Sequence, residues 1–251
     1  LKSELTQSFE CFFIAAKIAE EEKMTNKLGR INISIADIYS IMGNYTNSIN
    51  HYRSAIKILK KENDSIGIAS ALLNAGDSYF LNGKYEEALQ NFEESGVIFE
   101  KIDYLIGTAY NLGNVGMVYA EQGKNILAEK NINEAISILE EMQDYYPISI
   151  YLTYMSDIYL KKNDWKSAEK YSQRSLALAE KYSLKKEISA ANLQLSELYE
   201  KKELNNTSLK YYKEHIRYRD IVKNIESVEN IADLRTNHEV SQKQIEVDLK
   251  Q

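Results

Sequence analysis

The sequence predicts an all-α protein made of stacked pairs of antiparallel helices. Its 251 residues include one proline and ten glycines, well below the usual frequencies of about 5% and 7%. Strands and their turns need more of both residues, so an all-β fold is nearly excluded. The second observation is an internal period of forty residues, which lies in the range of stacked-repeat architectures.

Tyrosines and small residues carry this period. The tyrosines recur at one fixed register: Tyr39, Tyr79, Tyr119, Tyr159 and Tyr199. A small residue stands three positions before each of them: Ala36, Gly76, Gly116, Ser156 and Ser196. Others stand nine positions after: Ser48, Ala88, Ala128, Ala168 and Ser208. A third column, seven further on, reads Ala55, Ser95, Ala135 and Ser175, and only His215 breaks it. We expect close helix–helix contacts at these columns, with the tyrosine rings packed beside them.

Each unit is expected to contain two helices joined by a turn. Glycine or asparagine suits the left-handed conformation that ends a helix. Four units supply one, at Gly43, Gly83, Gly123 and Asn163, whereas the fifth has Glu203. Pro147 is expected near the start of a first helix, where its missing N–H costs nothing.

The order of a small residue, Tyr, Gly-x-Tyr, Ala, an aromatic residue and Ala resembles the tetratricopeptide repeat (TPR), most clearly from Asn74 to Phe92. The usual unit of about 34 residues is shorter, so the helices here should be longer by about a turn and a half together. Such long repeats are similar to those of bacterial peptide-sensing regulators and animal spindle-orientation adaptors. The resemblance implies an α-solenoid, a right-handed superhelix of helix pairs.

The expected domain organisation has three parts. Residues 1–28 align with the second helix of a unit and are expected to be what remains of a truncated upstream repeat. Residues 29–228 contain five units of forty. Residues 229–251 lack glycine and proline, and two interpretations of this long C-terminal helix remain open. It either caps the last repeat or begins a coiled coil that leads to an output domain.

Composition excludes several classes of function. The net charge of −6 argues against nucleic acid as the main ligand. The longest apolar run, Cys11–Ala16, is too short to span a bilayer, and we expect a cytoplasmic location. No phosphate loop, catalytic motif or metal-ligand spacing is present. We therefore expect no enzyme activity, no cofactor and no metal, and we expect Cys11 to be a buried small residue.

The resemblance implies that first helices line a concave face with positions two, five, six, nine and thirteen of each unit. The sixth positions include Asn74, Asn114, Tyr154 and Gln194. Asparagine donates and accepts, so Asn74 and Asn114 could hold the backbone of an extended peptide. The alternative is that they only bridge adjacent repeats by hydrogen bonds.

The ninth positions read Asp37, Asp77, Met117, Asp157 and Glu197. This acidic row favours a partner that carries Lys or Arg, although a solvated row without a ligand is the alternative. Four other residues are expected to supply apolar contact: Tyr110, Leu73, Ile33 and Leu81.

Two functions fit this pattern. The first is a protein- or peptide-sensing array within a larger bacterial signalling protein, whose output would be a cyclase, a histidine kinase or a DNA-binding domain. The second is a stand-alone adaptor that joins two proteins. The first predicts an output domain beyond Gln251, and the second predicts that the chain ends within a few turns. A homodimer through the C-terminal helix is compatible with either function.

Overall fold

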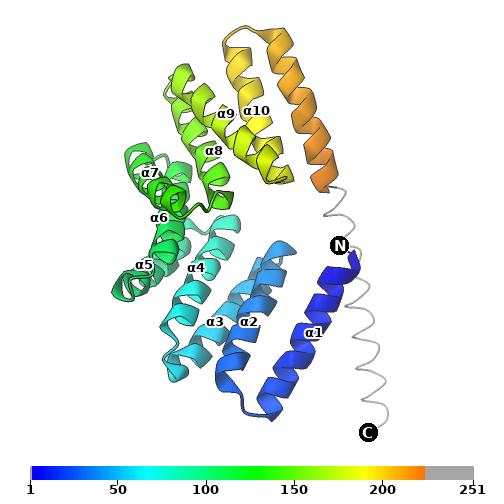
Figure 1. Ribbon diagram of the computed structural model, residues 1–251, viewed down its shortest axis with the longest axis vertical. Coiled ribbons are helices and arrows are strands. Elements are labelled where there is room, and N and C mark those ends of the chain that lie inside the picture. The colour runs from blue at the N-terminus through cyan, green and yellow to red at the C-terminus, as the bar shows by residue number, and fades with distance from the viewer. Residues whose placement is uncertain (1, 224–251) are drawn as a thin grey trace. The chain divides into compact units, whose positions relative to one another are not determined.

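The computed structural model describes residues 2–223, and throughout this range the chain forms helices joined by short turns (Figure 1). The helices are α1 (Lys2–Glu21), α2 (Thr25–Ile41), α3 (Tyr45–Glu62), α4 (Ser65–Leu81), α5 (Tyr85–Lys101), α6 (Leu105–Glu121), α7 (Asn125–Glu141), α8 (Tyr146–Lys161), α9 (Trp165–Lys181) and α10 (Lys185–Lys201). A further helical stretch covers residues 205–223. The predicted all-α class is confirmed.

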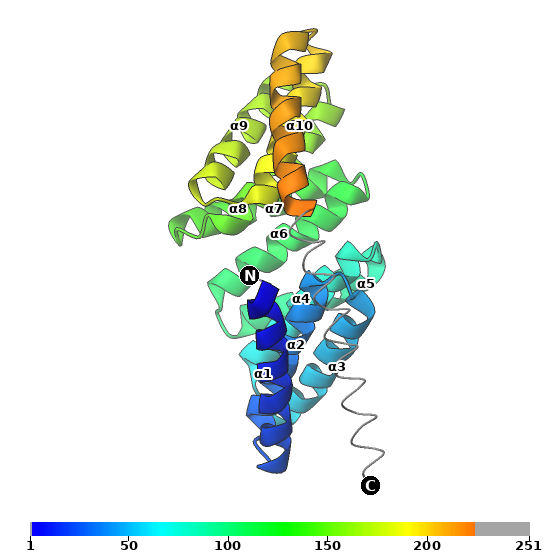
Figure 2. The same ribbon diagram turned by 90° about the vertical axis from the view of Figure 1, so that its right-hand side faces the viewer.

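The described helices form two compact units that divide between Asn82 and Gly83. In the first unit, α2 packs against α1, α3 and α4 (Figure 2). In the second unit, helices that are consecutive in the chain pack together from α5 to α10, and α8 also contacts both α6 and α10. Within each compact unit, consecutive helices therefore pack together, and three pairs of first helices from successive repeats are also in contact: α2 with α4, α6 with α8, and α8 with α10. This is the helix-pair stacking expected of a TPR solenoid.

A left-handed backbone residue ends each helix, and these residues recur every twenty positions. The predicted turn residues Gly43, Gly83 and Gly123 have φ of 71–72°, and Asn163 has φ of 58°. The connections between repeats use residues other than glycine at the same spacing: Lys23, Asn63, Asp103, Gln143 and Ser183. The following amide then bonds back to the helix, as from Asn44 N to the Tyr39 carbonyl oxygen at 2.8 Å. This is the Schellman pattern that ends helices.

The small-residue columns lie in the helix contacts, as predicted. Ala36, Ser156 and the other three residues of the first column are buried. At Gly116, an added Cβ would lie 2.6 Å from Ile132 Cγ1 and 3.2 Å from the Ala128 carbonyl oxygen. Helices α6 and α7 approach so closely that a side chain at position 116 would have to displace them.

A three-residue clamp joins neighbouring repeats in the second unit. Tyr159 of α8 and Lys162, which directly follows α8, both donate to the carboxylate of Glu129 on α7. The same arrangement recurs forty residues later in Tyr199, Lys202 and Glu169. The clamp ties the second helix of one repeat to the first helix of the next.

Other sequence predictions have mixed outcomes. Pro147 lies in the first turn of α8, as expected. Cys11 is exposed, so the expectation of a buried cysteine was wrong. The helical periodicity of the sequence gives the face of the helix on which Cys11 lies, but it does not decide whether another helix covers that face. Among the helices described in residues 2–223, none is both long and apolar enough to cross a membrane. The expected cap or connector at residues 229–251, with its dimer contact, lies outside the described residues.

Glu203 generates a stability prediction. It has φ of 59°, a conformation that costs an L-residue about 1 kcal/mol and costs glycine little. Glu203→Gly should therefore raise the free energy of unfolding by about 0.5–1 kcal/mol, measured by urea denaturation. Glu134→Gly, in the middle of α7, should instead lower it by about 1 kcal/mol. Equal destabilisation by both changes would contradict the role given to the turn.

Candidate functional site

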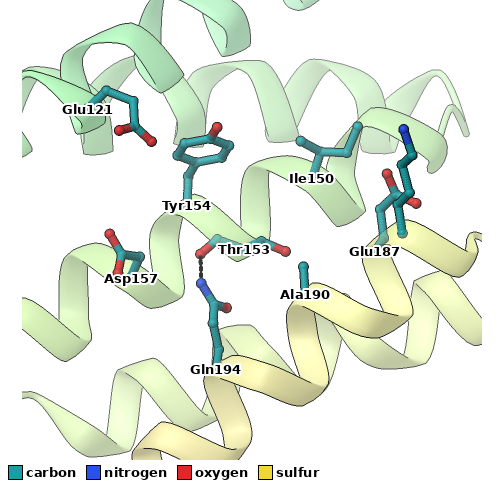
Figure 3. A pocket seen from close by; sticks show the side chains of 9 residues that line it. Glu121, Ile150, Thr153, Tyr154, Asp157, Glu187, Ala190 and Gln194 are labelled. Atoms are coloured by element: carbon teal, nitrogen blue, oxygen red, sulfur yellow. Dashed lines mark hydrogen bonds between the residues drawn. The ribbon is translucent and has the colours of Figure 1, made fainter. Parts of the chain in front are cut away.

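A pocket of about 340 Å³ opens on the first helices of the second unit (Figure 3). Its volume is at the lower end of the range for small-ligand pockets. Helices α6, α8 and α10 supply its walls: Glu121 from α6; Ile150, Thr153, Tyr154 and Asp157 from α8; and Lys186, Glu187, Ala190 and Gln194 from α10.

Seven of these nine residues stand at the concave positions that the sequence predicts. They are Ile150 and Ala190 at position two, Thr153 at five, Tyr154 and Gln194 at six, Asp157 at nine, and Glu121 at thirteen. The structure thus brings together three of the residues predicted by name, Tyr154, Asp157 and Gln194. The columns also contained Glu121, Ile150, Thr153 and Ala190, which sequence reasoning did not single out. Lys186 and Glu187 lie outside the columns, one turn before Ala190.

Gln194 connects two walls of the pocket. Its Nε2 donates to the backbone carbonyl of Thr153 at 2.7 Å, which ties α10 to α8 (Figure 3). The Thr153 hydroxyl in turn donates to the Ser149 carbonyl at 3.1 Å, within α8. These bonds hold the pocket floor and orient the Gln194 amide before any ligand binds.

The pocket has a negative potential around Tyr154. Burial raises the pKa of the Tyr154 hydroxyl above its usual value, and the negative charges of Glu121 and Asp157 raise it further. Asp157 forms an ion pair with Lys161 one turn later, with Nζ 2.5 Å from Oδ2. Glu197, the predicted acidic residue of the fifth repeat, is exposed on α10. Neighbouring atoms nevertheless exclude part of the water around its carboxyl group, which raises its pKa, and the charge of Asp157 raises it further.

Comparison with protein families decides what this array is. Residues 29–206 match the model of the MalT-like TPR region. The chain belongs to this family. No protein with curated annotation matches its sequence.

Solved structures show the same TPR fold. BtubC (BKLC) from P. vanneervenii is 16% identical, with 91% of each chain covered and a TM-score of 0.62. A Rap protein complexed with competence and sporulation factor is 16% identical, with a TM-score of 0.67 over 88% of this chain and 61% of that one. The Rap conjugation gene regulator of plasmid pLS20, in complex with the Phr* peptide, is 20% identical, with a TM-score of 0.59 over 90% and 72%. At these identities the likeness concerns the fold.

Elsewhere in the second compact unit, the ring of Tyr151 fills the space between α6 and α8. Tyr151 is only 2% exposed, and its hydroxyl donates to Asn114 Oδ1 at 3.0 Å and to the Tyr110 carbonyl at 3.2 Å. The ring fits because position 113 is glycine, where an added Cβ would lie 2.0 Å from Tyr151 Cζ. Asn114 is consequently buried and bridges α6 to α8. The Tyr110 hydroxyl donates to Asp144 at 2.8 Å.

The other predicted site residues lie in the first of the two compact units, which ends at Asn82. Asn74 Nδ2 donates to Asp37 Oδ1 at 3.0 Å, a bond between the first helices of two adjacent repeats. Tyr52 of α3 donates to the same carboxylate oxygen. Of the predicted apolar contacts, Ile33 packs on the core, Leu73 is buried and Leu81 is exposed.

The negative charge of Asp37 raises the pKa of Asp77. Burial raises the pKa of Asp37, while hydrogen bonds from Tyr52 and Asn74 lower it in part. Burial, with the negative charge of Asp37, raises the pKa of Asp77 to about 7. Near neutral pH the acidic row is thus only partly charged at Asp77.

Across the described residues, no group of three or more His, Cys, Asp or Glu side chains is arranged to hold a metal ion. The lining side chains of the pocket include charged groups, the aromatic ring of Tyr154 and the amide of Gln194.

Asp77 makes the stability of the first unit depend on pH. Its pKa is about 7 in the folded chain against an ordinary 3.8, so between these values the folded state keeps a proton that the unfolded chain has lost. Its contribution to stability is present below about pH 4, falls as the pH rises, and is lost above about pH 7. In Asp77→Asn the part of the decline due to Asp77 should be absent, and the shift from 3.8 to about 7 makes this part roughly 4 kcal/mol between pH 4 and 8.

Urea unfolding at pH 4, 6 and 8 measures this difference. Glu134→Gln, an exposed change of the same kind on α7, serves as the control and should follow the unmodified protein. A decline in Asp77→Asn as large as that of the unmodified protein would show that Asp77 does not hold the proton.

Proposed function

We propose that this chain is a binding module for a peptide or an extended segment of a protein, and that the partner occupies the pocket formed by α6, α8 and α10. The observation that carries the proposal is the convergence of seven concave-position residues on one pocket. The bonded Gln194 supports it further, because a preorganised wall lowers the entropic cost of binding. Two of the structural neighbours are complexes, one with competence and sporulation factor and one with the Phr* peptide.

The charges of the pocket favour a basic partner. Glu121, Asp157 and Glu187 are acidic, and Lys186 is the basic residue among the lining side chains. A segment that carries Lys or Arg would gain from this potential, mainly in specificity and association rate.

We further propose that the module is the regulatory part of a larger bacterial signalling protein, where the bound partner changes the packing of the repeats. Stacked helix pairs contact mainly their neighbours, so a ligand that bridges α6, α8 and α10 acts on two helix contacts at once, α6 with α8 and α8 with α10. A stand-alone adaptor remains the second candidate. An adaptor would bind its partner without any change in the packing of the repeats. Amide hydrogen exchange, measured with and without a bound peptide, distinguishes the adaptor from the regulatory module.

A volume substitution tests the binding site. Ala190 is half-buried on the pocket wall, and Ala190→Tyr should fill the pocket and weaken binding of a library-selected peptide by about tenfold or more. Ala177 is exposed on α9, outside the pocket lining, so Ala177→Tyr is the matched control and should leave the affinity unchanged. Binding is measured by fluorescence anisotropy with peptides from a random display library. Equal affinity of both variants would place the binding site elsewhere.

A further inference from the structure

One end of the pocket has the chemistry of a cation site. The carboxylates of Glu121 and Asp157 and the side chain of Tyr154 gather there, from α6 and α8 (Figure 3). A tyrosine ring attracts cations through its negative face, and carboxylates accept charge-assisted hydrogen bonds from ammonium or guanidinium groups. Both charges act on Tyr154, since Glu121 and Asp157 each raise the pKa of its hydroxyl beyond the effect of burial.

A cation of this chain already lies beside these acids. Lys161 pairs with Asp157 at 2.5 Å, and both side chains are largely exposed, by 60% and 40%. Its hydrogen bond to Asp157 raises the pKa of Lys161, and the charge of Glu121 contributes as well. An exposed pair of this kind contributes at most about 1 kcal/mol, so another cation can displace Lys161 at little cost.

We propose that this end of the pocket binds one Arg or Lys side chain of the partner, that the cation lies against Tyr154 between Glu121 and Asp157, and that Lys161 competes with it for Asp157. The inference rests on the proposed binding function and specifies the chemistry of its main anchor.

The rest of the pocket fits such a side chain. Ile150, Thr153 and Ala190 lie beyond Tyr154 (Figure 3) and offer apolar surface to the methylene stem of Arg or Lys. Arginine should bind more strongly than lysine, because its planar group both stacks on the ring and bonds two acceptors. A divalent metal fits less well, because the described chain offers no group of three metal-binding side chains there.

The test compares matched peptides on matched variants. The probe is a library-selected peptide whose binding Ala190→Tyr weakens, together with its copy in which arginine is replaced by citrulline, an isostere without charge. The unmodified protein should bind the arginine peptide about tenfold more tightly than the citrulline peptide. In the double variant Glu121→Gln, Asp157→Asn this preference should disappear.

Lys161→Gln gives a gain of affinity, which loss of folding cannot imitate. Removing the competitor should tighten binding of the arginine peptide about threefold and leave the citrulline peptide unchanged. Glu134→Gln, on the exposed face of α7, should change neither affinity.

The outcomes separate the two proposals. Selected peptides that bind at the pocket with no preference for arginine over citrulline would overturn the cation site and leave the binding function standing. A preference unaffected by Lys161→Gln would overturn the competition. If no library peptide binds the unmodified protein, or if Ala190→Tyr has no effect on those that do, the binding function and the cation site fail together.

Discussion

The left-handed residue that recurs every twenty positions is the constraint on which the repeats depend. It ends each helix at a fixed point, from Lys23 through Gly43 to Glu203, so helices of similar length alternate in direction along the chain. Because all repeats share the same length, equivalent positions of first helices face the same way in successive repeats within each compact unit. The pocket residues Tyr154 and Gln194 come from the same position of successive repeats for this reason.

Single side chains decide whether the concave face of the first helices is open or filled. Between α6 and α8, Gly113 lets the ring of Tyr151 lie against the helix, where it covers Asn114. Between α8 and α10, Ala190 takes little space and leaves the pocket open beside Ile150. The same backbone arrangement therefore gives a packed contact in one place and a binding pocket in the next. The Tyr–Lys–Glu clamps lie between second and first helices, away from the pocket lining, and stabilise the stack without occupying the pocket.

Much of the fold could be predicted because periodicity fixes which face a residue occupies. The small columns and the turns at Gly43 and Asn163 follow directly from spacing and backbone preference. The degree of burial of a side chain and the residues that it contacts could not be predicted, since both depend on side chains that come from other helices. The pKa of Asp77 is set by burial and by Asp37, and the burial of Asn114 by Tyr151. Glu203 adopts the turn conformation although its residue type disfavours it, because the helices on both sides fix the backbone there.

The claim that the concave positions of α8 and α10 form the binding site is tested most directly by site-specific photocrosslinking. Benzoylphenylalanine is placed at exposed Lys186 on the pocket lining, and in a second protein at exposed Ala177 on α9, and each is irradiated with the same library-selected peptide. A partner bound in this pocket is captured from position 186 and not from position 177. Capture from position 177 alone would place the partner on the second helices and contradict it.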